Sequence, residues 1–229
     1  MSLLAPRRVA AVAVGAVIAA TLTALGAAAP ASAHGLANSA LSWEVSSYFD
    51  EHLADHVLTD GATEADDGVI TFPGGVADVD ADGVARIAYA GSVAASFSTY
   101  YTVTIADPVV TVAPDGDGEI SAVVSASNIE SPMGPADSTD PTRVVVTTFS
   151  VDGWTADAVP TVAATPDWAG VLPEGPESVA LGIGAGKPVD GQSFAPEFLG
   201  QLTPGVQGLF YATGSPSDAK KAPATFSSE

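Results

Sequence analysis

The stretch from residue 83 to residue 127 limits the fold more than any other part of the sequence. It reads GVARIAYAGSVAASFSTYYTVTIADPVVTVAPDGDGEISAVVSAS. Val, Ile, Thr and Tyr favour strands, and the Asp, Gly and Pro groups between them favour tight turns. The segment DVDADG at 78–83 fits the same scheme as a hairpin turn, because Tyr89 stands where a calcium loop needs its glutamate. The pattern predicts antiparallel strands joined by short turns.

Only two segments have helical spacing. Apolar residues recur every three to four positions over residues 38–58, with acidic residues between them, which predicts an amphipathic helix. A shorter amphipathic segment covers Phe194–Leu202. We therefore expect a mainly β fold, an antiparallel β-sandwich or meander, with one N-terminal amphipathic helix and one short C-terminal helix.

The first 33 residues have the form of a secretory signal peptide. Arg7 and Arg8 precede an Ala/Val-rich run that ends in the small-residue cleavage site Ala31-Ser32-Ala33. We expect residues 34–229 to form one domain, with a core at about 37–226. No later apolar stretch is long enough to span a bilayer. The sequence thus predicts a protein that is secreted or held at the cell surface, and it has no cysteine for disulfides.

Charge and motifs exclude several classes of function. The formal net charge is −20, from 27 Asp and Glu against 7 Lys and Arg. Such a chain repels phosphate backbones, so we expect no nucleic-acid partner. The sequence contains no nucleophile elbow, phosphate loop or dinucleotide fingerprint. We therefore expect a binding protein and not an enzyme.

The three histidines are the candidate metal ligands. His52 and His56 are four residues apart, with Tyr48 one turn earlier, so a helix would place all three on one face. This pair lacks a third ligand, and on spacing alone two half-exposed histidines on an amphipathic helix are the better explanation. Cleavage after Ala33 would make His34 the first residue, whose amine and imidazole can chelate copper. A copper-binding protein is therefore a second alternative.

Several segments together resemble one family. LSWEVSSYFDEHL at 41–53, ITFP at 70–73, GSV followed by TIADP, and the closing GLFYATGSPSDAKKAPATF are similar to the heme-transport-associated (HtaA-type) domain of actinobacterial surface proteins. The resemblance covers about residues 37–226. It implies a β-rich extracellular module that captures heme and passes it to other relay proteins or an importer. Its partner would be heme or a heme protein.

The match at the iron site is uneven. In the family, a tyrosine on the first helix binds the heme iron. A histidine from a mid-chain strand donates a hydrogen bond to that tyrosine. Here the tyrosine position is His52, and the segment that should supply the histidine reads AASFSTYY. The resemblance then implies His52 as the iron ligand, with Tyr48, Tyr100 or Tyr101 as its partner.

Two further expectations follow from the resemblance. Phe210 and Tyr211 match the family's closing aromatic pair, so we expect them to wall a cavity whose floor carries His52. The alternative is that the domain has lost heme binding and now serves as an interaction or structural domain of the cell envelope.

Overall fold

The computed structural model describes residues 34–35, 39–131, 135–155, 161–183 and 188–229. All of them belong to one compact unit, Ala31–Glu229. The predicted signal peptide, residues 1–33, lies outside the described residues. Within the described ranges, no helix combines the length and the apolar character that crossing a bilayer would need.

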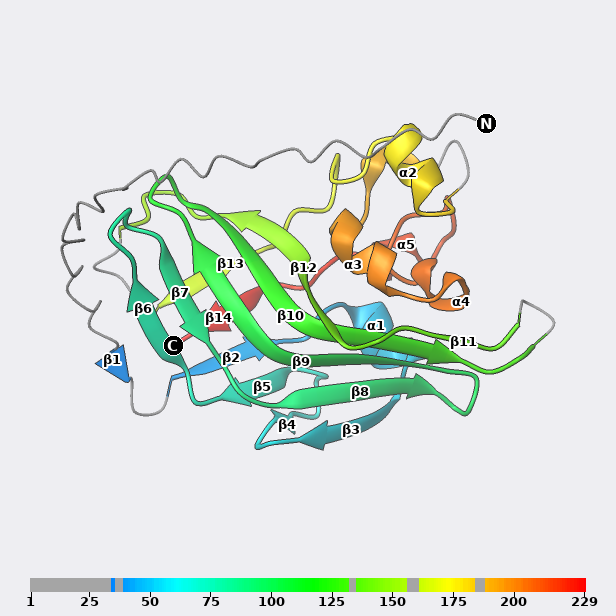
Figure 1. Cartoon of the computed structure of the whole chain (residues 1–229), viewed down its shortest axis with the longest axis horizontal. Helices are drawn as coiled ribbons and strands as arrows, with labels where there is room; N and C mark the ends of the chain where they lie inside the picture. Colours follow the sequence, from blue (N-terminus) through cyan, green and yellow to red (C-terminus); the bar gives the residue numbers. More distant parts are fainter. Residues whose placement is uncertain (1–33, 36–38, 132–134, 156–160, 184–187) are drawn as a thin grey trace, which may run out of the picture. The chain divides into compact units, whose positions relative to one another are not determined.

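Antiparallel strands form two sheets, and the larger has nine strands among the described residues (Figure 1). Its main order is β1-β6-β7-β9-β10-β11, while β12 also pairs with β10, and β8 links β9 to β3. The strands are β1 His34–Gly35, β3 Asp55–Thr59, β6 Val76–Val79, β7 Ala85–Ala88, β8 Ser92–Phe97, β9 Tyr101–Val112, β10 Asp117–Asn128, β11 Asp137–Ser138 and β12 Thr142–Ser150. The mainly β, antiparallel fold expected from the sequence is confirmed.

The smaller sheet joins distant parts of the chain. Its order is β13-β14-β2-β5-β4. The strands are β2 Ala40–Trp43, β4 Thr63–Glu64, β5 Ile70–Pro73, β13 Val162–Ala164 and β14 Phe226–Ser228. Trp43 of β2 lies opposite Phe226 on one side and Ile70 on the other. The last described strand therefore pairs with one of the first.

Strand β9 is long because it serves two partners. Its first half pairs with β8 and its second half with β7. The change of partner falls near Asp107, which has a φ of 48°, and the register against β10 shifts nearby. Asp107 donates its backbone N–H to Gly91, and its carbonyl accepts from Arg143. The Asp-Pro step of the sequence thus marks an irregularity that re-aims the strand.

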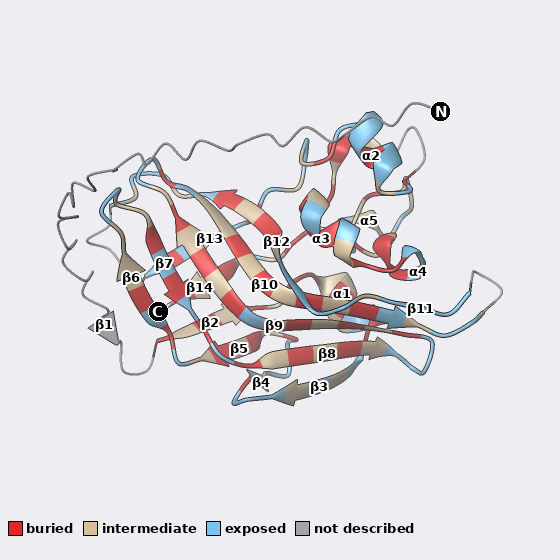
Figure 2. Ribbon diagram, viewed as in Figure 1, coloured by how far each residue is buried: buried red, intermediate tan, exposed pale blue. Residues whose placement is uncertain are grey.

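Side chains from both sheets fill one core. Buried and partly exposed residues alternate along β9 and β10, as Figure 2 shows. This period of two buries every second side chain on one face of the sheet. The largest fully buried side chains include Trp43, Phe49, Phe72, Phe149 and Phe226.

The helix predicted over 38–58 is wrong in extent. Only α1, Ser47–His52, is helical, and β2 and β3 occupy the flanking residues. Val45 lies between β2 and α1 and has a φ of 69°, so the backbone there is neither strand nor helix. The apolar positions themselves were read correctly, because Leu41, Val45, Phe49 and Leu53 are all buried. Pairing with β14 and β5 outweighed the helical spacing around Leu41.

The short C-terminal helix is confirmed as α3, and further short helices accompany it. They are α2 Pro176–Ala180, α3 Pro196–Gln201, α4 Pro204–Gln207 and α5 Asp218–Lys221, with a 3-10 turn at Val189–Gly191. Helix α3 packs on β12 and β10, and α5 contacts α1. Proline stands at the first position of α2, α3 and α4, where its missing N–H costs no helical hydrogen bond.

Candidate functional site

Two short elements bring an aromatic group together at one end of the larger sheet. Helix α1 carries Tyr48 and His52, while Phe97 ends β8 and Tyr101 begins β9. A tight turn joins these two strands, with Ser98 at a φ of 51° and Tyr100 donating its backbone N–H to Phe97. We call Tyr48, His52, Phe97, Tyr100 and Tyr101 the aromatic cluster.

His52 lies in the middle of the aromatic cluster. Its imidazole is stacked between Tyr48, at a ring-centroid distance of 4.7 Å, and Phe97, at 4.8 Å. The interplanar angles are 10° and 7°, so the three rings are nearly parallel. The edge of the ring is engaged as well, because Nε2 of His52 is hydrogen-bonded to the hydroxyl of Tyr101 at 2.6 Å.

The charge state of this pair follows from its burial. Burial lowers the pKa of His52. Burial, and secondarily the neighbouring Tyr48, raise the pKa of Tyr101. Both groups are therefore neutral at neutral pH, and they share one hydrogen bond. A neutral imidazole keeps a lone pair, which is what coordination of a metal requires.

Part of the aromatic cluster faces solvent. Phe97 is 41% exposed and Tyr100 is 47% exposed, whereas Tyr101 is 8% exposed. Phe97 and Tyr100 are stacked neighbours, and adjoining exposed apolar side chains mark binding sites more often than isolated ones do. Tyr100 and Tyr101 also line a cavity of about 120 Å³ with Asn128, Ile129 and Pro204. That volume is below the roughly 300–1,000 Å³ of typical small-molecule sites.

The predicted site residues divide into two groups. Tyr48, His52 and Tyr100 lie together in the aromatic cluster, and among the three candidate tyrosine partners Tyr101 is the one bonded to His52. Phe210 is 1% exposed and packs edge-on against two phenylalanines of the core. It lies on the inner side of α1, 6.4 Å from the ring of Phe49.

Tyr211 has a separate environment. Its side chain is partly buried, burial raises its pKa, and its backbone carbonyl accepts a hydrogen bond from the amine of Lys221. That amine lies 5.9 Å from the ring of Tyr48. Tyr211 is thus linked to the aromatic cluster through Lys221, and its own ring is not among the described contacts of His52.

The other two histidines lie outside the aromatic cluster. The expectation that His52 and His56 share a helical face is wrong, because α1 ends at His52 and His56 belongs to β3. The backbone of His34 pairs with Ala77 of β6. The side chain of His34 lies outside the described residues, so the copper hypothesis stays a prediction.

Phe97 is the residue that the sequence did not single out. It covers one face of His52 and contacts both Tyr100 and Tyr101. The available signal was the turn in SFSTYY, since a two-strand hairpin there places Phe97 directly opposite Tyr101.

Comparisons with known proteins identify the family and the fold. A family model described as Htaa matches residues 38–195. The fold is similar to the C-terminal domain of HtaA from Corynebacterium glutamicum, with 18% identity and a TM-score of 0.50, covering 86% of this chain and 98% of that one. No match was found among curated proteins.

Two further solved structures show weaker similarity. The N-terminal domain of HtaA from Corynebacterium glutamicum has 14% identity and a TM-score of 0.45, covering 60% of this chain and 85% of that one. The heme binding protein HtaB from Corynebacterium glutamicum has 12% identity and a TM-score of 0.37, with 59% and 81% covered. At these identities the comparisons of structure concern the fold alone.

Proposed function

The chain belongs to the HtaA family, and from that premise we propose that it binds heme outside the cell and passes it to a relay protein or importer, without catalysing a reaction. The hydrogen bond between His52 and Tyr101 inside a partly exposed aromatic cluster is the observation that carries this proposal.

A histidine and a tyrosine suit ferric heme iron. Imidazole nitrogen and phenolate oxygen are both established heme ligands, and a hydrogen bond from a second group orients and tunes whichever one binds. In this chain the helix supplies the histidine and the strand supplies the tyrosine, the reverse of the pattern that the family resemblance implies. The exchange keeps both chemical groups as a bonded pair.

We assign the iron ligand to His52 and the supporting hydrogen bond to Tyr101. His52 is neutral at neutral pH because burial lowers its pKa, so it can bind iron without first losing a proton. Tyr101 would need to ionise, and burial opposes this by raising its pKa. For Tyr101 to keep its hydrogen bond to Nε2, His52 would bind iron through its other nitrogen, Nδ1.

The exposed aromatic rings would meet the porphyrin. A flat apolar macrocycle gains most from stacking on aromatic side chains. The cavity of about 120 Å³ is too small to enclose heme, so heme would lie against the exposed side of the aromatic cluster. Phe97 ends β8 and is 41% exposed, so its ring would be one of those that meet the porphyrin.

Heme also carries two carboxylates, which a strongly acidic protein must accommodate. Lys220 of α5 is half exposed and pairs with Glu51, the residue before His52, with a nitrogen–oxygen distance of 2.5 Å. It is thus an exposed cation near the proposed iron ligand. Exchange of Glu51 for a heme carboxylate would cost little, because exposed ion pairs are weak.

A hemin titration followed by Soret absorption tests the proposal. We expect tight binding by the wild-type protein, loss of the ligated spectrum in His52→Ala, and weaker binding in Tyr101→Phe, by roughly 10-fold to 100-fold. Tyr100→Phe is the matched control, since it removes only a neighbouring hydroxyl, and it should bind normally. Failure of the wild-type protein to shift the Soret band would refute heme binding. A spectrum unchanged in His52→Ala and lost in Tyr101→Phe would move the ligand to Tyr101.

A further inference from the structure

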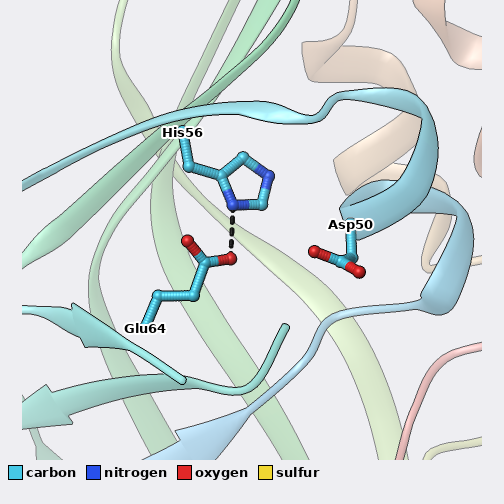
Figure 3. Close-up of side chains that lie close together, drawn as sticks. All are labelled: Asp50, His56 and Glu64. Carbon is cyan, nitrogen blue, oxygen red and sulfur yellow. Dashed lines mark hydrogen bonds and ion pairs between the residues drawn. The ribbon is translucent and has the colours of Figure 1, made fainter. Parts of the chain in front are cut away.

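A second group of side chains that can bind a metal lies on α1 and on two strands beside it. Asp50 of α1, His56 of β3 and Glu64 of β4 each offer one nitrogen or oxygen atom, and these atoms all lie within 4.8 Å of one another. Figure 3 shows the two carboxylates facing the imidazole from different segments of the chain. We call these three residues the Asp-His-Glu cluster. None of them belongs to the aromatic cluster.

His56 is held as metal-binding histidines usually are. Its side chain is only 5% exposed, and Nδ1 is bonded to Oε1 of Glu64 at 2.5 Å. Its other nitrogen, Nε2, is buried and has no hydrogen-bond partner among the described residues. A histidine that ligates a metal generally has its second nitrogen fixed by a carboxylate or carbonyl. A buried imidazole nitrogen without a partner costs stability unless a ligand meets it.

Asp50 also lacks a partner for its carboxylate among the described residues. The carboxylate lies directly over Gly68, where a Cβ atom would come within 2.5 Å of Cγ of Asp50. Gly68 therefore leaves the space that the carboxylate occupies. Asp50 and Glu64 bring two carboxylates to one imidazole, so their charges are not balanced even when His56 is protonated.

The protein's own cations do not balance this charge. Every described Lys and Arg side chain is engaged elsewhere: Arg86 with Asp80, Arg143 with backbone carbonyls, Lys220 with Glu51 and Lys221 with Asp218. In a chain with a net charge of −20, two carboxylates that converge on a buried imidazole call for a cation from solution.

We propose that the Asp-His-Glu cluster binds a divalent transition-metal cation of the zinc class. Nε2 of His56 and a carboxylate oxygen of Asp50 would bind the ion, while Glu64 orients the imidazole through Nδ1. A nitrogen ligand suits zinc-class ions, whereas calcium and magnesium take oxygen ligands alone. Bonds of about 2.0–2.2 Å would draw the ligand atoms closer than they lie here. Rotation of the Asp50 side chain, which no hydrogen bond from the described part of the chain restrains, provides that movement.

The bound cation would act as a clamp on α1. It would connect α1 to β3 and β4, so that a six-residue helix is fixed at Asp50, two residues from His52. The site stands independently of heme binding, because its three residues do not touch iron in the proposed function.

Isothermal titration of the metal-free protein with ZnCl₂, paired with thermal unfolding, tests this site. We expect one zinc ion per chain and a rise in the unfolding midpoint of about 5–10 °C at a 100-fold excess over the dissociation constant. Asp50→Asn and Glu64→Gln keep the side-chain shape and should each weaken binding roughly 10-fold to 100-fold. Asp55→Asn, which changes an exposed carboxylate beside His56, is the matched control and should bind normally.

Two more measurements separate this site from other histidines. His34→Ala and His52→Ala should both retain zinc binding, and zinc should shift the imidazole NMR signals of His56 in the unsubstituted protein. The proposal is overturned if zinc does not bind, if Asp50→Asn and Glu64→Gln bind like the wild type, if His34→Ala loses binding, or if CaCl₂ binds as tightly as ZnCl₂. Hemin binding can fail without affecting any of these results.

Discussion

His52 is enclosed on three sides by aromatic residues. Tyr48 and Phe97 cover its two faces, and Tyr101 takes its Nε2. This enclosure explains why the pKa of His52 is lowered, because burial disfavours the charged imidazolium. Protonation of His52 therefore opposes the folded arrangement and also removes the lone pair that iron would need.

We expect the pKa of the His52 imidazole, followed by NMR, to lie below the ordinary histidine value of 6.5 because the ring is partly buried. As pH falls, His52 of the unfolded chain takes up a proton before His52 of the folded chain does. The stability that neutral His52 contributes is therefore complete above about pH 6.5 and is lost as pH falls below this value through the folded-state pKa. Hemin affinity should fall over the same interval. A midpoint above 6.5 for His52, or hemin affinity that rises on acidification, would contradict this.

Asp218 organises the segment that follows Tyr211. Its carboxylate accepts backbone hydrogen bonds from Thr213, Gly214 and Ser215, and it pairs with Lys221 at 3.0 Å. Burial alone would raise the pKa of Asp218, but the hydrogen bonds from Lys221, Thr213 and Ser215 outweigh it and hold this pKa far below its ordinary range.

Asp218→Asn should lower the free energy of unfolding by about 1–3 kcal/mol at neutral pH, because the amide cannot accept the same set of hydrogen bonds. The lowered pKa stabilises the wild type above about pH 4, and this contribution is lost as pH falls below that value. Urea unfolding at several pH values checks both effects. The difference between the two proteins should shrink on acidification, and a constant difference would contradict the role of the charge.

At the residue scale, the sequence predicted which residues form the candidate site better than it predicted which of them contact one another. The spacing of Tyr48 and His52 and the resemblance to a heme-binding family pointed to the two residues that do stack. The turn in SFSTYY indicated that Phe97 lies opposite Tyr101, but its approach to His52 depends on pairing between β3, β8 and β9, which a single sequence does not specify. Phe210 was placed by resemblance alone, and packing with Phe194 and Phe198 determines where it lies.

Helix α1 is short, although it carries two residues of the aromatic cluster. It has six residues, begins after Ser46, and presents Tyr48 and His52 on its outer side with Phe49 buried beneath. The side chain of Ser46 accepts the backbone N–H of Phe49 at 3.1 Å and so caps the helix. So short a helix would be unstable alone, and packing and capping maintain it.

Ser46→Ala should cost about 1 kcal/mol of unfolding free energy and also weaken hemin binding, because the cap positions the turn that carries His52. Chemical denaturation and hemin titration measure the two effects. Glu51→Gln, which breaks only the exposed pair with Lys220, is the control and should change stability by less than about 1 kcal/mol. Equal losses in both variants would argue against a specific role for the cap.

At the element scale, local patterns predicted strands well and the first helix badly. Alternation and turn residues indicated the segments that became β7 to β10. The spacing over 38–58 was ambiguous, because apolar residues four apart satisfy a helix and also a strand–helix–strand path that buries the same side chains. Residues 40–43 form a strand because they pair with β14, which lies almost two hundred residues away in sequence. No local pattern contains that partner.

The whole molecule depends on one core between two sheets. Trp43 is fully buried at the centre of the smaller sheet, between β14 and β5, and belongs to the same hydrophobic cluster as Val103, Ile105 and Ile120 of the larger sheet. Without cysteine, the protein cannot rely on disulfides, so loss of core packing is not compensated by covalent links.

Trp43→Ala should therefore lower the free energy of unfolding by about 3–5 kcal/mol. Circular dichroism should show one transition for both sheets, because they share the core. Val179→Ala, at an exposed position of α2, should leave the midpoint within a few degrees of the wild type. Two separate transitions in Trp43→Ala would mean that the sheets are independent folding units.

Strand β14 lies between β13 and β2 and supplies the partner of each. Without Phe226–Ser228, β13 and β2 would each present an unpaired strand edge. Such edges pair readily with neighbouring chains. A chain that lacks these three residues should therefore associate and aggregate, whereas the unshortened chain keeps both edges covered.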